Sequence, residues 1–212
     1  MSEAMIDAAL IEQCADPSLT PAIVEEFIAA AGSEDPLNVT VRAGSKTFLV
    51  PKAKSPQEAM KLVQDHLGKA VVRVGLTQYP VGIGVTDKSQ VTAEVFDTCN
   101  NIKIGTALFA RVYRVVTKWY GTPVQEAFED AIEAYQTGYF DGDYVFTAED
   151  PGESVELAAP DPAASAEGAP APEADNASPD PRNELRQQLW AQDPNKADIG
   201  VDLSGIGDFN RE

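Results

Sequence analysis

Two cysteines and a single histidine are the side chains of this 212-residue chain best suited to nucleophilic or metal chemistry. Cys14, Cys99 and His66 supply too few ligands for a typical structural zinc site, which takes four. A Cys-His pair can act as a nucleophile, but neither cysteine stands in a context typical of one. We therefore interpret the cysteines first as two buried thiols. We expect no metal and no cofactor.

Three short stretches follow one another in a fixed order along the chain. Residues 75–78 read Gly-Leu-Thr-Gln, residues 96–102 read Phe-Asp-Thr-Cys-Asn-Asn-Ile with Gly105 after them, and residues 131–138 read Ala-Ile-Glu-Ala-Tyr-Gln-Thr-Gly. In this order they resemble the lysozyme-like lytic transglycosylases of type IV secretion systems. The resemblance implies a lysozyme-like fold with a groove that binds glycan.

A second resemblance concerns the run at residues 71–80, Val-Val-Arg-Val-Gly-Leu-Thr-Gln-Tyr-Pro, and the Lys-Trp-Tyr-Gly at residues 118–121. Together they are similar to the TraH family of conjugal transfer proteins, which are encoded beside secretion genes. The likeness covers about Met5 to Gly152. It implies a role in conjugal transfer.

The transglycosylase resemblance implies roles for individual residues. Gln78 matches the family's glutamine, which contacts sugar. Tyr135 matches the aromatic residue near the catalytic acid, and Gln136 stands where asparagine is usual. For Gln78 and Tyr135 a purely structural role is the alternative.

Three further groove residues follow from the same resemblance. Asn101 matches an asparagine that ties the start of its helix to the groove, and the alternative is a simple helix cap. Tyr79 and Tyr139 are candidate faces for stacking on sugar rings. An aromatic residue at either position is otherwise a core residue.

The family's reaction needs one glutamic acid that protonates the oxygen leaving between N-acetylmuramic acid and N-acetylglucosamine. In the family it lies five residues before the proline of an Asn-Pro-Leu turn. Here the turn at residues 35–37 reads Asp-Pro-Leu, and the equivalent position is Ala31. Glu34 is the best-placed replacement, because Glu25 and Glu26 point about 240° and about 140° away from position 31 around a helix. A solvated surface acid is the alternative for Glu34, and we expect no enzyme activity.

The two cysteines acquire a second interpretation from the transglycosylases. Cys14 and Cys99 stand where secreted relatives place a disulfide that joins the first helix to the groove. In this chain the first helix is expected within residues 14–37. A disulfide is therefore the alternative to two thiols, and it requires an oxidising compartment.

Local signals predict the elements that hold these residues. Residues 20–32 read as a capped helix, residues 55–68 as a helix with a Ser-x-x-Glu capping box, and residues 101–119 as the longest helical pattern. Residues 122–138 predict another helix, capped by its first threonine and ended by its last glycine. Residues 39–51 alternate apolar and polar side chains, as a hairpin does. These elements predict a mainly α, α+β fold class with a small β-hairpin, and the resemblance implies that the domain is lysozyme-like.

Composition divides the chain at residue 146. The domain is expected at residues 1–146, and residues 147–212 form a Pro/Ala/acidic tail that we expect to be disordered. The tail holds 15 acidic and 4 basic residues, which accounts for 11 of the chain's 18 net negative charges. Short apolar patterns near residues 182–192 and 199–209 predict docking segments within it.

The charge also limits the partners and the location. Phosphate binding depends on Lys and Arg, so we expect no direct contact with nucleic acid. No apolar run approaches the roughly 20 residues of a membrane span. The acidic N-terminus lacks the basic and apolar regions of a secretory signal. The expected location is cytoplasmic, or periplasmic if another route exports the protein.

These observations predict an accessory protein of conjugal transfer by type IV secretion. Its degenerate transglycosylase-like domain is expected to act as a binding or scaffold module. Peptidoglycan glycan strands are candidate partners, and the tail is expected to bind other secretion proteins. Two alternatives remain open: an active lytic transglycosylase that uses Glu34, and a cytoplasmic partner of the transfer machinery that binds no glycan.

Overall fold

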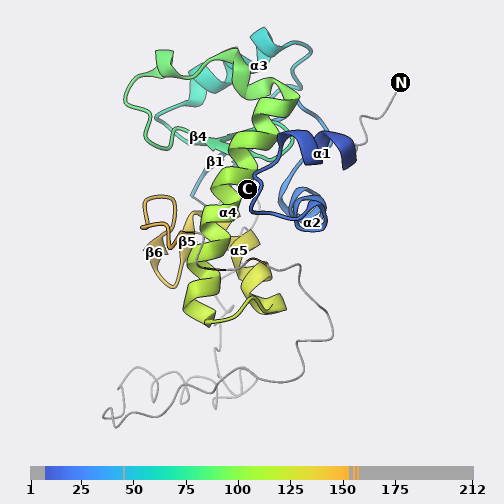
Figure 1. Ribbon diagram of the computed structural model, residues 1–212. Helices are drawn as coiled ribbons and strands as arrows, with labels where there is room; N and C mark the ends of the chain where they lie inside the picture. The colour runs from blue at the N-terminus through green and yellow to red at the C-terminus, as the bar shows by residue number, and fades with distance from the viewer. Residues whose placement is uncertain (1–7, 45, 153–154, 156, 158–212) are drawn as a thin grey trace, which may run out of the picture. The chain divides into compact units, whose positions relative to one another are not determined.

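Five α-helices and two antiparallel sheets make up the described part of the chain in a computed structural model that covers residues 8–44, 46–152, 155 and 157 (Figure 1). The helices are α1 (Ala8–Cys14), α2 (Pro21–Ala31), α3 (Pro56–His66), α4 (Thr98–Tyr120) and α5 (Gln125–Thr137). The strands are β1 (Val39–Ala43), β2 (Lys46–Phe48), β3 (Val71–Val74), β4 (Tyr79–Val81), β5 (Tyr139–Phe140) and β6 (Asp143–Tyr144), with short 3-10 helices at Lys88–Gln90 and Ala93–Phe96. The docking segments predicted near residues 182–192 and 199–209 lie outside the described residues.

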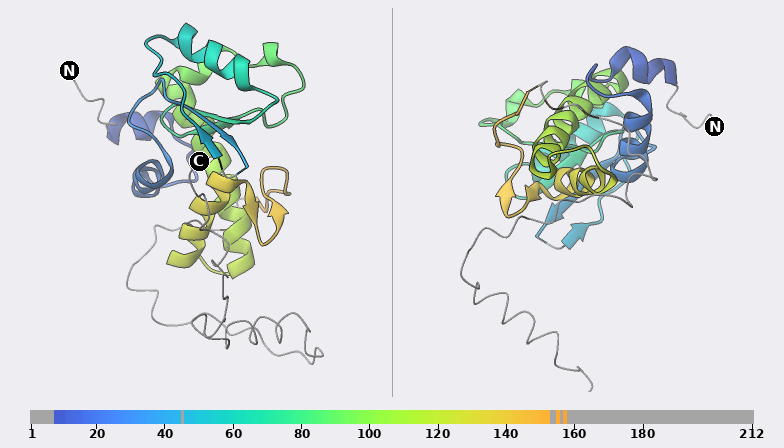
Figure 2. Two further views of the ribbon diagram at one scale, coloured as in Figure 1. Left: turned by 180° about the vertical axis from the view of Figure 1, so that it is seen from behind. Right: turned by 60° about the horizontal axis from the view of Figure 1, so that its bottom comes forward.

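Helix α4 is the longest element, and α1, α5 and β4 all pack against it. In Figure 1 and in the left view of Figure 2, α3 and the larger sheet lie toward its N-terminal half and α5 toward its C-terminal half. Its N-cap is Asp97, whose carboxylate accepts a hydrogen bond from the Asn100 N–H at 2.9 Å. The helix therefore begins three residues before the predicted start at Asn101. Among the helices described, none is both long enough and apolar enough to cross a membrane.

Two predicted helix starts differ from the structure in detail. Ser55 accepts from the Glu58 N–H as expected, but the Glu58 carboxylate bonds the N–H of Lys54 and not that of Ser55. At α5 the cap is Val124, which makes no side-chain bond, so the predicted Thr122 cap is wrong. The Thr122 carbonyl accepts from the Val124 N–H in a tight turn, and this turn delays the helix.

The N-terminal region also differs from the expected single first helix within residues 14–37. Helix α1 ends at Cys14, and a turn around Asp16 separates it from α2. Pro21 occupies the first turn of α2, and the Thr20 hydroxyl accepts from the Ile23 N–H. Proline is favoured at a helix start and forbidden in its interior, so a new helix begins at this residue.

The larger sheet has the order β2-β1-β3-β4, with every neighbouring pair antiparallel. It contains the predicted hairpin as β1 and β2, and it adds two strands on either side of the Gly-Leu-Thr-Gln stretch. Valines alternate along β1 and β3, so one face of the sheet is apolar and packs against α3. The other face carries Thr40, Arg42 and Arg73, and it leads to the site described below.

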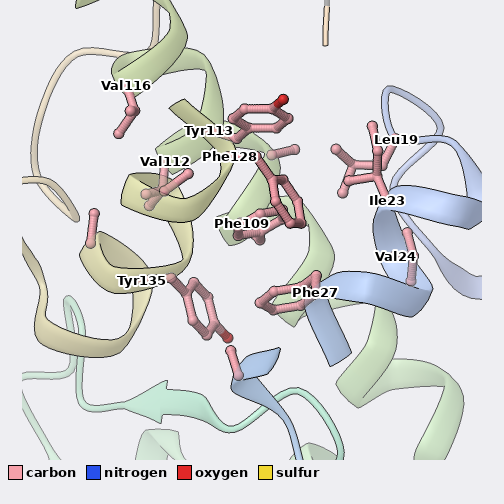
Figure 3. Packing of buried hydrophobic residues seen from close by; sticks show 14 of the residues in the cluster. Leu19, Ile23, Val24, Phe27, Phe109, Val112, Tyr113, Val116, Phe128 and Tyr135 are labelled. Atoms are coloured by element: carbon pink, nitrogen blue, oxygen red, sulfur yellow. The ribbon is translucent and has the colours of Figure 1, made fainter. Parts of the chain in front are cut away.

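The main core lies between α2, α4 and α5 and is rich in aromatic rings (Figure 3). Phe27 stacks on Phe109 with ring centroids 4.2 Å apart, and Tyr135 meets Phe27 edge-on at 4.9 Å. Val112 and Val116 are buried as predicted, but Trp119 is 61% exposed. Trp119 lies in the last turn of α4, where its ring meets those of Tyr120 and Phe140 edge-on.

The packed body continues past residue 146, where the sequence placed the start of the tail. Arg111 on α4 donates to the Ala148 carbonyl, and Arg114 forms an ion pair with Asp150 at 2.6 Å. Leu157 packs against the main core. Acidic composition alone did not reveal that two arginines of α4 hold the start of this segment.

Candidate functional site

The three sequence stretches converge on one loop. Residues Gly75–Gln78 connect β3 to β4 and touch the side chains of Asn101 on α4 and Tyr135 on α5. The loop also meets the end of α2, where the Ser33 N–H donates to the Leu76 carbonyl at 2.8 Å. We call Gly75–Gln78, Asn101, Gly105 and Tyr135 the motif knot. The motifs are thus neighbours in space as well as in order.

Asn101 is the centre of the knot and is 1% exposed. Its amide nitrogen donates to the carbonyls of Val74 at 3.2 Å and Val95 at 2.9 Å. Its amide oxygen accepts from both the N–H and the hydroxyl of Thr77, at 2.9 Å each. These four bonds use the full capacity of a side-chain amide. Asn101 therefore fastens the loop to α4, and it does not cap the helix.

Gln78 is 7% exposed and takes a left-handed backbone conformation, with φ of 49°. Its amide nitrogen donates to the Gly75 carbonyl at 2.9 Å, and its amide oxygen accepts from the Thr40 hydroxyl at 2.7 Å. Both ends of the side chain are thus bonded within the protein. This arrangement holds the loop in its turn and joins it to β1.

Tyr135 is fully buried, and its hydroxyl donates to the Thr77 carbonyl at 3.0 Å. Burial raises its pKa well above the usual value for tyrosine, so the hydroxyl remains a neutral donor. The ring contributes to the main core beside Phe27. Tyr135 therefore links the loop to the aromatic core.

Arg73 is a buried cation of the site that sequence reasoning missed. It is 5% exposed and donates to three carbonyls: those of Gln78 at 3.0 Å, Tyr135 at 2.6 Å and Gln136 at 2.9 Å. Two of these belong to the last turn of α5, where the helix dipole favours a positive charge. Burial lowers the Arg73 pKa, although arginine stays charged. The signal that could have revealed it is a single charged residue within the apolar run Val-Val-Arg-Val.

Close backbone approach explains the glycines around the knot. A methyl group on Gly105 would lie 2.1 Å from the Thr77 hydroxyl oxygen, and one on Gly75 would lie 2.4 Å from the Asn101 amide nitrogen. On Gly32, at the end of α2, it would lie 2.3 Å from the Leu76 carbonyl oxygen. No side chain fits at these distances, so glycine is required for the loop to approach both helices.

The remaining predicted site residues lie around the knot or apart from it. Gln136 is exposed and donates to the Ala30 carbonyl at 3.1 Å, which ties α5 to α2. Tyr79 is half-buried on β4. Tyr139 is 58% exposed on β5. Ala31 is buried in the main core, whereas Glu34 is exposed in the loop that follows α2.

Cys14 and Cys99 form a disulfide between the end of α1 and the first turn of α4. The first interpretation, two buried thiols, is therefore corrected. Leu76 and Ile102 pack beside the bond and connect it to the motif knot. The sequence could not decide between thiols and disulfide, because the answer depends on the distance between two residues 85 positions apart.

The described residues also limit the chemistry of the site. Among them, no group of three or more His, Cys, Asp or Glu side chains is arranged to hold a metal ion. The knot itself contains hydroxyls and amides but no carboxylate, and the Arg73 guanidinium is bonded to its Gln78 and Tyr135 carbonyls. Its polar groups are placed to bond one another.

Comparison with known proteins gives two positive findings. Residues 5–208 match the sequence model of the TraH_2 family. An uncharacterized protein of Sinorhizobium fredii, y4dP, is 54% identical over 156 residues, which cover 71% of this chain and 78% of that protein. No solved structure matches the chain significantly.

Proposed function

The chain belongs to the TraH_2 family, which is a conjugal transfer family, and from this premise we propose that it is a non-catalytic module of the transfer machinery. In this proposal a degenerate transglycosylase-like domain binds or scaffolds other components. The order of the three motifs supports the relationship to lysozyme-like enzymes. The internal bonding of the same motifs supports the loss of catalysis.

One observation carries the proposal: the position that the transglycosylase resemblance assigns to the catalytic acid holds the buried residue Ala31. A general acid must keep its proton near neutral pH, which needs a poorly solvated carboxyl group next to the substrate. The methyl side chain of alanine has no acidic proton to donate. Glu34 is three residues away in an exposed loop, so it lacks the burial that the reaction requires.

The disulfide supports an oxidising compartment for this module, because such bonds are rare in the reducing cytoplasm of most cells. This favours a module that acts in the periplasm over the alternative, a cytoplasmic partner of the transfer machinery. Other transfer proteins, and peptidoglycan strands near them, are then the partners that the module would meet.

The direct test is release of 1,6-anhydro muropeptides from purified peptidoglycan by the full-length protein, with Glu34→Gln in parallel. We expect neither protein to release product. Turnover by the wild type that Glu34→Gln abolishes would show a displaced acid and overturn the proposal. Sedimentation of the protein with the same peptidoglycan then separates a glycan-binding module from one that only binds protein.

A further inference from the structure

A pocket of about 560 Å³ lies between the larger sheet and the β5–β6 hairpin. Its floor includes Arg42 and Arg73, which lie on the face of the sheet opposite α3. Its walls come from the turn between α3 and β3 and from Tyr139 and Tyr144 on the hairpin. In Figures 1 and 2 this hairpin, drawn in orange, lies beside the sheet. The volume is in the range of sites for small organic ligands.

The lining is basic, although the chain as a whole is strongly acidic. It contains Arg42, Lys69 and Arg73 but no Asp or Glu. The described ion pairs include neither arginine, and the side chain of Arg42 makes no hydrogen bond to another described residue. Arg73 is nine-tenths buried, and its Nε–H has no partner. Two guanidinium charges therefore lack a counter-ion in this part of the structure.

These two charges act on each other. Arg42 contributes to the lowered pKa of Arg73, after the larger effect of burial. A buried charge without an opposite charge destabilises the folded protein, and a neighbouring like charge adds to this effect. An anion bound beside Arg42 would relieve both effects, because each interaction is stronger in a partly buried pocket than in water.

The rest of the pocket is apolar and aromatic. Tyr139 and Tyr144 are both substantially exposed, and their rings meet at an angle of 61° with centroids 5.4 Å apart. Val71, also exposed, and Phe146 extend the apolar surface. Inorganic phosphate would bind the arginines, but the apolar side chains would remain in contact with water. An organic anion would contact both the arginines and the apolar surface.

We propose that the sheet–hairpin pocket binds an organic carboxylate, with Arg42 as the main donor to the carboxylate, Arg73 as a fixed second charge, and the two tyrosines as walls for the ligand's body. A peptide with an acidic residue and an N-acetylmuramic acid residue that carries no stem peptide share this chemistry. The pocket would bind such a ligand whether or not the protein turns over glycan. A negative binding result for the pocket would therefore leave the proposed function standing.

The test is an NMR titration of the full-length protein with two matched pairs of probes. N-acetylmuramic acid is compared with N-acetylglucosamine, which lacks the lactyl carboxylate, and N-acetyl-phenylalanyl-glutamate with N-acetyl-phenylalanyl-glutamine. We expect saturable shifts around the pocket with at least one of the two acids, and weaker binding of its neutral partner. Whichever acid binds identifies the source as glycan or peptide.

Two variants locate the interaction. Arg42→Gln should weaken binding of the acid about tenfold, the loss expected for one charge-assisted hydrogen bond. Lys103→Gln, on the exposed face of α4, should leave binding unchanged. The proposal is overturned if neither acid binds up to its solubility limit, if the neutral probes bind equally well, or if Arg42→Gln binds like the wild type while folded by circular dichroism.

Discussion

The side-chain oxygen of Asn101 accepts two hydrogen bonds from Thr77, one from its backbone N–H and one from its hydroxyl, both at 2.9 Å. The two residues are 24 positions apart and belong to different motifs. Both are buried. In this chain the motifs thus contribute to stability through one another, and each bond in the knot can be tested by substitution.

Replacing Asn101 with alanine should destabilise the protein strongly. The Thr77 N–H and the carbonyls of Val74 and Val95 would lose their partner inside the protein, and each such group costs about 1–3 kcal/mol. We expect a loss of about 3 kcal/mol or more in the free energy of unfolding by urea. Asn100→Ala, one residue earlier and at the surface, should cost about 1 kcal/mol or less. Equal losses for the two variants would argue against the knot.

Gly105→Ala tests the close approach of the loop to α4. Helix propensity alone predicts that this change stabilises the protein by about 1 kcal/mol. The structure predicts the opposite sign, because the new methyl group would lie 2.1 Å from the Thr77 hydroxyl oxygen. We expect destabilisation of about 2 kcal/mol or more in thermal or urea unfolding. Ala107→Gly, on the exposed side of the same helix, reports propensity alone and should cost about 1 kcal/mol.

Reduction of the Cys14–Cys99 bond should lower stability by about 2–4 kcal/mol, because the bond closes a long loop and restricts the unfolded chain. The measurement is urea unfolding with and without a reductant. The Cys14→Ser and Cys99→Ser double variant should match the reduced wild type and no longer respond to the reductant. A wild-type midpoint that is unchanged by reduction would refute this contribution.

Asp150 should add an acid-sensitive contribution to stability. Its hydrogen bond to Arg114 is the main cause that lowers the Asp150 pKa to about 2. In the unfolded chain an aspartate has a pKa of about 3.9. Because the folded value is the lower one, the contribution is complete above about pH 4 and is lost as the pH falls toward 2.

The Asp150 carboxylate is 36% exposed, so solvent screening keeps this contribution at or below about 1 kcal/mol. Asp150→Asn should lower the free energy of unfolding at pH 7. Near pH 2 the variant and the wild type should be equally stable. The measurement is urea unfolding of both proteins across this pH range. Asp143→Asn, on the exposed β6 strand, serves as the matched control. If the difference in stability between the wild type and Asp150→Asn stays constant with pH, the Arg114–Asp150 pair is not its cause.

Local signals predicted the helices better than the site. Thr20 with Pro21, and Ser55 with Glu58, marked helix starts correctly, because caps depend on residues a few positions apart. The four-stranded sheet and the Asn101–Thr77 bonds depend on contacts between distant residues, which periodicity does not encode. The sequence placed Gln78 and Tyr135 near each other but could not show that both are buried. Arg73 went unnoticed, because its role depends on carbonyls at the end of α5.

The motif residues are bonded to one another inside the protein. Hydrogen exchange of the side-chain amides of Asn101 and Gln78, followed by NMR on the full-length protein, tests this bonding most directly. Both should exchange far more slowly than the exposed amide of Gln57. Exchange as fast as that of Gln57 would contradict the account and indicate an open groove.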